Sequence, residues 1–186
     1  IAQVRADVQA AVVVFTYANP IFKMGTDAFA ARAAAAGVDG VLVLDLPIEE
    51  AGPFRQTVVD AGIDPIFLLS PTTTDLRIRA AAELGRGFLY AISRLGVTGA
   101  RAEVASGARA LVERIRAVTA LPVAVGFGLS RPEHVRQVGE WADAAVVGSA
   151  LVDRIADGIA EQHTDEVIVD SVTNLVSDLA KGLAVG

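Results

Sequence analysis

The sequence contains no cysteine, which excludes disulfide bonds, thiolate-bound metals and a cysteine nucleophile. Histidine is nearly absent as well. His134 and His163 lie far apart on predicted helices, and we expect both at the surface and not at a metal. Lysine and arginine form no cluster, and the net charge is −6. Nucleic acid and anionic membranes are therefore poor partners on electrostatic grounds.

Long apolar runs are also missing. No stretch approaches the length of a membrane span, and no signal peptide is recognisable. What is present is a chain of 186 residues that is 53% hydrophobic and rich in alanine, long enough for one domain with a sizeable core. We therefore expect one soluble, cytoplasmic domain over residues 1–186, with many helices.

Six short apolar runs with many β-branched residues recur along the chain. Their hydrophobicity is continuous and not alternating, which is typical of parallel strands covered on both faces. The predicted strands are 12–17, 40–44, 65–69, 87–92, 122–125 and 144–147. Helical periodicity between and after them predicts helices over 26–36, 48–61, 75–84, 104–118, 130–140, 149–159 and 165–183.

Consecutive strand–helix units allow a doubly wound open sheet or a (β/α)₈ barrel. A doubly wound dinucleotide-binding fold would carry its glycine fingerprint after the first strand, but here that strand leads into TYANPIF. The glycines come late, where barrels commonly build phosphate sites. We therefore predict an α/β fold of the TIM (β/α)₈ barrel family with about six βα units. The first two strands are expected to be missing, because a full barrel takes roughly 250 residues and this chain of 186 is short by about two units. It also opens with what resembles the tail of a helix.

Three glycine-containing turns follow predicted strands: RLGVTGA at 94–100, VGFGLS at 125–130 and VVGSAL at 146–151. Parallel strands end at a common rim, so the backbone N–H groups of these turns could converge on a phosphate, aided by the helix that begins at Ser149. The alternative is three unrelated tight turns. Ser130 with Glu133, and Thr72 with Asp75, match capping boxes for the helices predicted over 130–140 and 75–84.

Other candidates lie at the same rim. Asp45 follows a predicted strand and could act as a base, orient a partner or cap the helix predicted from residue 48. Tyr17 and Tyr90 are the only two tyrosines, and both fall at strand ends. Several apolar residues near strand ends could line a pocket or belong to the core: Phe15, Leu42, Leu68 and Phe127.

The motifs YANP, DLP-x-EE and SR-x-GVTG occur in this order, followed by VGFGLSRPE and VVGSALV. From about residue 12 to about residue 152 the sequence resembles the α subunit of tryptophan synthase. The resemblance implies a barrel that cleaves indole-3-glycerol phosphate to indole and glyceraldehyde 3-phosphate, a retro-aldol reaction without a cofactor in this subunit. It also implies a heterotetramer with a β subunit that carries pyridoxal phosphate.

The resemblance assigns site residues one by one. Those implied to hold the substrate phosphate are Gly99, Phe127, Gly128, Gly148 and Ser149. Those implied to line the indole pocket are Phe15, Tyr17, Leu42, Leu44, Leu68 and Phe127. Tyr90 is implied to lie near the reacting carbon as a catalytic residue, and Thr98 to belong to a closing loop. Those implied to face the β subunit are Asn19, Asp45, Pro47 and Glu50.

One departure from the family pattern is clear. No stretch resembles the PFSDP-type segment near the family's acid–base glutamate and its aspartate helper, so the chain is expected to correspond to units three to eight only. Such a chain should be unstable or inactive unless the missing part is supplied. A non-catalytic module that binds phosphate or a β-type partner is the alternative. Another phosphate-binding barrel enzyme would need a strand-end lysine, but Lys23 and Lys181 lie outside the strands.

Overall fold

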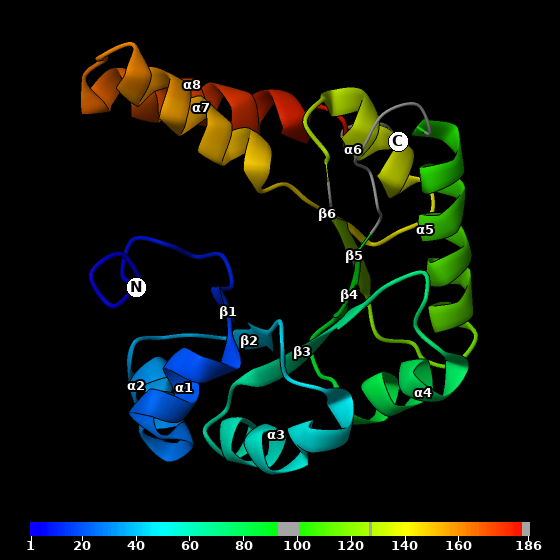
Figure 1. Ribbon diagram of the computed structural model, residues 1–186. Coiled ribbons are helices and arrows are strands. Elements are labelled where there is room, and N and C mark those ends of the chain that lie inside the picture. Colours follow the sequence, from blue (N-terminus) through cyan, green and yellow to red (C-terminus); the bar gives the residue numbers. More distant parts are fainter. Residues whose placement is uncertain (93–100, 127, 184–186) are drawn as a thin grey trace. The chain divides into compact units, whose positions relative to one another are not determined.

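The computed structural model describes residues 1–92, 101–126 and 128–183 (Figure 1). Strands and helices alternate along the chain. The strands are β1 (Val13–Thr16), β2 (Gly40–Val43), β3 (Asp64–Leu69), β4 (Leu89–Ile92), β5 (Val123–Gly126) and β6 (Ala144–Val146). The helices are α1 (Ala18–Met24), α2 (Thr26–Ala35), the 3₁₀ helix η1 (Ile48–Glu50), α3 (Ala51–Asp60), α4 (Asp75–Leu84), α5 (Arg101–Arg116), α6 (Pro132–Gly139), α7 (Ser149–Ala160) and α8 (Asp165–Ala180).

The strands follow one another in the sheet in chain order, from β1 to β6. β1 and β2 pair in parallel with Val13 opposite Gly40, β2 continues in parallel to β3, and β5 pairs in parallel with β6. Every predicted strand is present within two residues of its predicted bounds. The prediction of six parallel βα units is therefore confirmed.

The chain divides into two compact units. Unit 1 comprises Ile1–Tyr90 with Arg114–Leu121, and unit 2 comprises Ala91–Glu113 with Pro122–Gly186. Among the described residues, no helix combines the length and the apolar character that crossing a bilayer requires.

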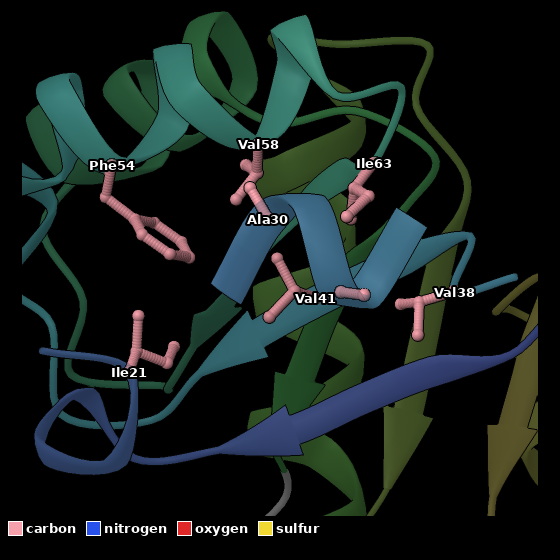
Figure 2. Close-up of a cluster of buried hydrophobic side chains, with 8 residues drawn as sticks. Ile21, Ala30, Val38, Val41, Phe54, Val58 and Ile63 are labelled. Carbon is pink, nitrogen blue, oxygen red and sulfur yellow. The ribbon is translucent and has the colours of Figure 1, made fainter. Parts of the chain in front are cut away.

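The core of unit 1 lies between β2 and the helices α1, α2 and α3. Phe54 and Val58 of α3 point toward Val41 of β2, and Ile21 of α1 closes one end of the group (Figure 2). Ala51, Phe54 and Val58 recur at three- and four-residue spacing, so one stripe of α3 is buried, as the periodicity predicts. This packing fixes which face of the β1–β3 sheet is left for other contacts.

Helix α1 was not predicted from the sequence. Pro20 is the third residue of α1. Proline is tolerated in a first turn, where its missing N–H would have had no partner within the helix. The helix predicted over 48–61 also differs: it begins as the 3₁₀ turn η1 and becomes α-helical at Ala51.

Both capping-box predictions are wrong. Thr74, and not Thr72, caps α4, because its hydroxyl accepts a hydrogen bond from the Arg77 N–H at 3.4 Å. The N-cap of α6 is Arg131, which precedes Pro132 and is extended, as a residue before proline is expected to be. The N–H of Ser130 instead donates to His134 Nδ1 at 3.3 Å.

In unit 2, α7 and α8 lie side by side as a helical hairpin (Figure 1). Gly158, the one buried residue of α7, lies where α8 approaches most closely: a Cβ built on it would be 2.7 Å from Ile168 Cγ1. Most other residues of α7 are exposed, and Val152 and Ile159 are 63% and 64% exposed.

Candidate functional site

One face of the sheet in unit 1 collects most of the residues predicted for the indole pocket. Phe15 pairs with Leu42, and Leu42 pairs with Ile66 on the next strand. Side chains opposite one another in a parallel sheet project from the same face, and successive residues alternate between faces. Phe15, Leu42 and Ile66 therefore form one row, while Val14 and Val41 face the helices.

Further predicted pocket residues lie just beyond this row. Tyr17 and Leu44 directly follow the ends of β1 and β2, and the Leu44 N–H extends the pairing by donating to the Thr16 carbonyl at 2.9 Å. Leu68 lies near the end of β3. Phe15 and Tyr17 are 58% and 57% exposed, whereas Leu42 is buried. Exposed aromatic rings grouped over a buried apolar floor are typical of a binding surface. Phe127 lies outside the described residues.

Tyr90 of β4 lies against this face. Its ring meets Phe15 edge to face, with 6.3 Å between the ring centroids and an interplanar angle of 68°. Burial raises the pKa of the Tyr90 phenol above its ordinary value of 10.0. The hydroxyl therefore stays protonated at neutral pH and can donate a hydrogen bond, but it cannot serve there as a base.

Asp45 is tied to α1. Its Oδ1 accepts a hydrogen bond from the backbone N–H of Ala18, the first residue of α1, at 2.7 Å. The alternative in which Asp45 caps the helix after it is wrong, because the N-cap of η1 is Pro47, without a side-chain hydrogen bond. The carboxylate instead joins the segment after β2 to the end of β1.

The four residues predicted to face a partner lie in two segments of unit 1. Asn19 is the second residue of α1, and the other three belong to the β2–η1 segment. All four are exposed: Asn19, Asp45, Pro47 and Glu50. Between them, Glu49 Oε1 accepts a hydrogen bond from Arg77 Nε of α4 at 2.7 Å, and this bond holds the pKa of the Glu49 carboxyl below its usual 4.5.

Two of the predicted phosphate-binding turns lie in unit 2. Gly126 at the end of β5 pairs with Val146 at the end of β6, and Gly128 and Gly148 each come two residues later. Both glycines are exposed. Gly128 has a φ of 72°, a conformation that favours glycine, and the buried Leu129 follows it.

The N-terminus of α7 follows the second of these turns. Gly148 is its N-cap and has no side chain with which to satisfy the first-turn N–H groups, and no acidic residue lies in that turn. The exposed Ser149 adds a hydroxyl. A helix N-terminus of this kind carries positive potential and attracts an anion. Gly99 and Thr98, from the third turn, lie outside the described residues.

No metal centre accompanies these groups: within the described parts of the chain, no three histidine, aspartate or glutamate side chains gather closely enough to hold a metal ion. The candidate groups in unit 1 are an apolar sheet face and an acidic surface, and those in unit 2 are glycine turns and a helix N-terminus.

Two groups were not predicted from the sequence: the Ile66 side chain and the backbone N–H of Ala18, which donates to Asp45. Ile66 lies two residues before the predicted Leu68 and on the same face of β3, so period-two alternation could have found it. The Ala18 donor is a backbone N–H, which has no signature in the sequence.

A series of parallel βα units with these features at strand ends defines an α/β protein of the TIM-barrel class. The family model described as tryptophan synthase alpha chain matches residues 1–183. The chain belongs to the tryptophan synthase alpha chain family.

Individual relatives agree with this assignment. The tryptophan synthase alpha chain of a Cyanothece species is 46% identical over 163 residues, which cover 87% of this chain and 61% of the relative. That of Geotalea daltonii is 44% identical over 181 residues, which cover 97% of this chain and 67% of the relative. The chain thus spans about three fifths to two thirds of the length of these curated relatives.

Solved structures show the same relationship. Tryptophan synthase subunit alpha from Legionella pneumophila superposes with a TM-score of 0.86 at 31% identity, over 98% of this chain and 66% of that one. Tryptophan synthase from Mycobacterium tuberculosis superposes with a TM-score of 0.85 at 36% identity, over 100% of this chain and 67% of that one. A chain from the tryptophan synthase α2β2 complex of Pyrococcus furiosus superposes with a TM-score of 0.84 at 36% identity, over 99% of this chain and 71% of that one.

Proposed function

We propose that this chain contributes the substrate-binding part of its family's reaction, the cleavage of indole-3-glycerol phosphate to indole and glyceraldehyde 3-phosphate, and that the acid–base carboxylates missing from its sequence must be supplied for turnover. The carbon–carbon bond between the indole ring and the glycerol chain breaks, the glycerol hydroxyl loses its proton as the aldehyde forms, and the ring carbon gains a proton. Atoms and electrons balance without a redox cofactor. The observation that carries the proposal is the exposure of Phe15 and Tyr17 at the end of β1, with the buried Tyr90 in edge-to-face contact with Phe15.

The sheet face of unit 1 is proposed to receive the indole ring. Phe15 and Tyr17 offer aromatic surface, and the Leu42 floor excludes water beneath it. Aromatic pairs prefer offset or edge-to-face contacts, and the edge-to-face contact between Phe15 and Tyr90 is of this kind. The proposed pocket residues are Phe15, Tyr17, Leu42, Leu44, Leu68 and Phe127. Tyr90, kept protonated by burial, is proposed to donate a hydrogen bond near the reacting carbon.

The glycine turns are proposed to hold the phosphate through backbone N–H groups. Gly128 presents its backbone without a Cβ, and α7 contributes the positive end of its dipole at Gly148 and Ser149. A lysine or arginine is not required for such a site. The proposed phosphate-binding residues are Gly99, Phe127, Gly128, Gly148 and Ser149, with Thr98 in a loop that closes over the substrate.

The exposed acidic segment of unit 1 is proposed to bind a β chain, which would carry the pyridoxal phosphate. Pro47 and Glu50 lie on a segment fixed by Asp45 at one end and Glu49 at the other. Asn19 is linked to it through the Ala18 N–H. We further propose that the chain works without a cofactor of its own and is located in the cytoplasm.

Calorimetric titration of the chain with indole-3-glycerol phosphate, combined with a colorimetric assay for released indole, tests the proposal. Binding is the expected result, accompanied by indole release once the segment that carries the acid–base carboxylates is added, and release should rise further with a β chain. Binding that inorganic phosphate displaces, with no release after both additions, would favour the alternative of a non-catalytic module. Absence of binding would refute both the cleavage reaction and a phosphate-binding module.

A further inference from the structure

The hydrogen bond between Asp45 and Ala18 joins two segments that sequence places far apart. The Asp45 Oδ1 accepts from the Ala18 N–H at 2.7 Å across a separation of 27 residues. Bonds from a backbone N–H to an ionised carboxylate are shorter and stronger than those between neutral groups. The bond therefore connects the end of β1 firmly to the segment that follows β2.

Helix α1 depends on this bond for its first turn. Its N-cap residue, Tyr17, makes no side-chain hydrogen bond to the helix. First-turn N–H groups have no partner within a helix, and a side-chain oxygen at the N-cap normally accepts from one of them. Here the acceptor comes from the neighbouring βα unit, so Asp45 takes the place of a local cap.

The residues on either side of Ala18 belong to different candidate sites. Tyr17 is 57% exposed on the proposed indole face, and Asn19 is exposed on the proposed partner surface. Ala18 itself is 8% exposed and packs into unit 1. A fixed Ala18 N–H therefore sets the direction in which both neighbours leave the backbone.

The Asp45 end of this link is itself held. Four residues further on, Glu49 of η1 bonds to Arg77 of α4 at 2.7 Å. The segment from Asp45 to Glu49 is thus attached to α1 at one end and to α4 at the other. Displacement of this segment by a partner would be transmitted to the start of α1 through the Asp45 carboxylate.

We propose that Asp45 is a positioning residue that couples the partner surface to the indole face through the Ala18 N–H. The inference rests on the proposed function and deepens it, because it names the contact by which one site influences the other. Asp45 acts by accepting a hydrogen bond and takes no part in proton transfer.

The test compares three single variants of the full chain and the double variant Asp45→Ala/Ala18→Pro. Asp45→Ala removes the acceptor. Asp45→Asn keeps an oxygen that can accept the same bond, and Ala18→Pro removes the donor at a first helical position, where proline is tolerated. Tyr17 is already extended, as the residue before a proline should be. Asp60→Asn is the matched control, since it removes a carboxylate charge on the exposed surface of α3 and leaves Asp45 and its segment intact.

Two measurements are made on each variant: hydrogen exchange at the start of α1 and the dissociation constant for indole by calorimetry. Asp45→Ala should speed exchange at the Ala18 N–H and weaken indole binding, each by about tenfold or more. Asp45→Asn and Asp60→Asn should stay within about threefold of the parent chain in both measurements. Ala18→Pro should weaken indole binding as much as Asp45→Ala does, and the double variant should be no weaker than either.

Three results would overturn the inference. Unchanged exchange in Asp45→Ala would mean that the bond does not hold α1. Loss of indole affinity in Asp45→Asn equal to that in Asp45→Ala would mean that the charge acts directly, and additive losses in the double variant would mean that the two residues act separately. If the parent chain binds no indole, the proposed indole face fails with the coupling to it, while exchange at Ala18 still reports whether Asp45 holds α1.

Discussion

Asp143, just before β6, bonds to Val123 at the start of β5: Asp143 Oδ2 accepts a hydrogen bond from the Val123 N–H at 2.8 Å. The Asp143 N–H donates in turn to the Val123 carbonyl at 3.0 Å. Asp39, just before β2, makes the same two bonds with Val12, at 2.7 and 2.9 Å. An aspartate one residue before the second strand of a parallel pair thus closes a ring with the beginning of the first. The ring fixes the register in both units.

Asp143→Ala should destabilise the chain by about 1 to 3 kcal/mol, because it leaves the N–H of the buried Val123 without its carboxylate acceptor. The measurement is the free energy of unfolding from urea denaturation. Asp60→Ala is the matched control: Asp60 accepts a bond from Gln56 on an exposed helix surface, and its loss should cost much less. Equal losses in the two variants would contradict the ring as the source of stability.

Arg114 of α5 holds the segment between β3 and α4. Its guanidinium donates to the Thr73 carbonyl at 2.7 Å, the Pro71 carbonyl at 3.4 Å and Asp75 Oδ1 at 2.9 Å. Arg114→Lys keeps the charge but loses the planar fork, so we expect a loss of about 1 kcal/mol and faster hydrogen exchange over residues 70–75. Arg109→Lys, in an exposed pair on the same helix, should leave both unchanged. Unaltered exchange in Arg114→Lys would contradict the prediction.

The Glu49 carboxyl should titrate below 4.5, because Arg77 donates a hydrogen bond to its charged form. A pKa lowered by folding contributes stability that is present above the unfolded value and lost as the pH falls through the folded one. The contribution should therefore disappear below about pH 4.5, and it should be small since both side chains are more than half exposed. Carboxyl NMR titration of the parent chain and of Arg77→Ala, in which the pKa should rise, provides the check.

Tyr90 should ionise above pH 10.0, because burial penalises the phenolate. A pKa raised by folding contributes stability that is complete below the unfolded value and lost as the pH rises toward the folded one, so alkaline solution above about pH 10 should weaken the fold. Ultraviolet titration in a Tyr17→Phe background isolates this group. Tyr90→Phe should retain the packing against Phe15, whereas Tyr90→Ala should cost about 3 to 5 kcal/mol. A small loss in Tyr90→Ala would contradict the buried placement.

Gly128→Ala should destabilise the chain by about 1 to 2 kcal/mol, because a side chain is strained at its φ of 72°. It should also weaken binding of inorganic phosphate, measured by calorimetry. Gly62→Ala is the control: Gly62 has a similar φ of 78° and open space around it, so stability should fall by a similar amount while phosphate affinity stays the same. Equal phosphate affinity in both variants would argue against the proposed anion site.

The strands could be predicted from sequence because a strand buried on both faces requires a continuous apolar run. Helix starts were less predictable, since several residues offered the same chemistry. Thr72, Thr73 and Thr74 can each cap a helix, and the choice is made by the Ser70 N–H, which donates to the Thr73 hydroxyl at 2.9 Å and leaves Thr74 for α4. Similarly, Pro132 forces Arg131 into an extended conformation, so the helix cannot begin at Ser130.

The apolar sheet face proposed to receive indole could largely be predicted, because Phe15, Leu42 and Leu68 are apolar residues near strand ends. The role of Asp45 was not, since its partner is the backbone of a residue 27 positions earlier. A carboxylate after a strand is compatible with a base, a cap or a link between units. Only the path of the chain between β1 and β2 determines which group comes within reach.

The contact of α7 with α8 at Gly158 has an evolutionary consequence. Any missense change in this codon adds at least a methyl group where Ile168 leaves no room for one, a Cβ there being 2.7 Å from its Cγ1. Substitution of Gly158 is therefore disfavoured unless residue 168 is first replaced by a smaller one. In divergent homologues the two sites should change as a pair, with a larger residue at 158 appearing only beside a smaller one at 168.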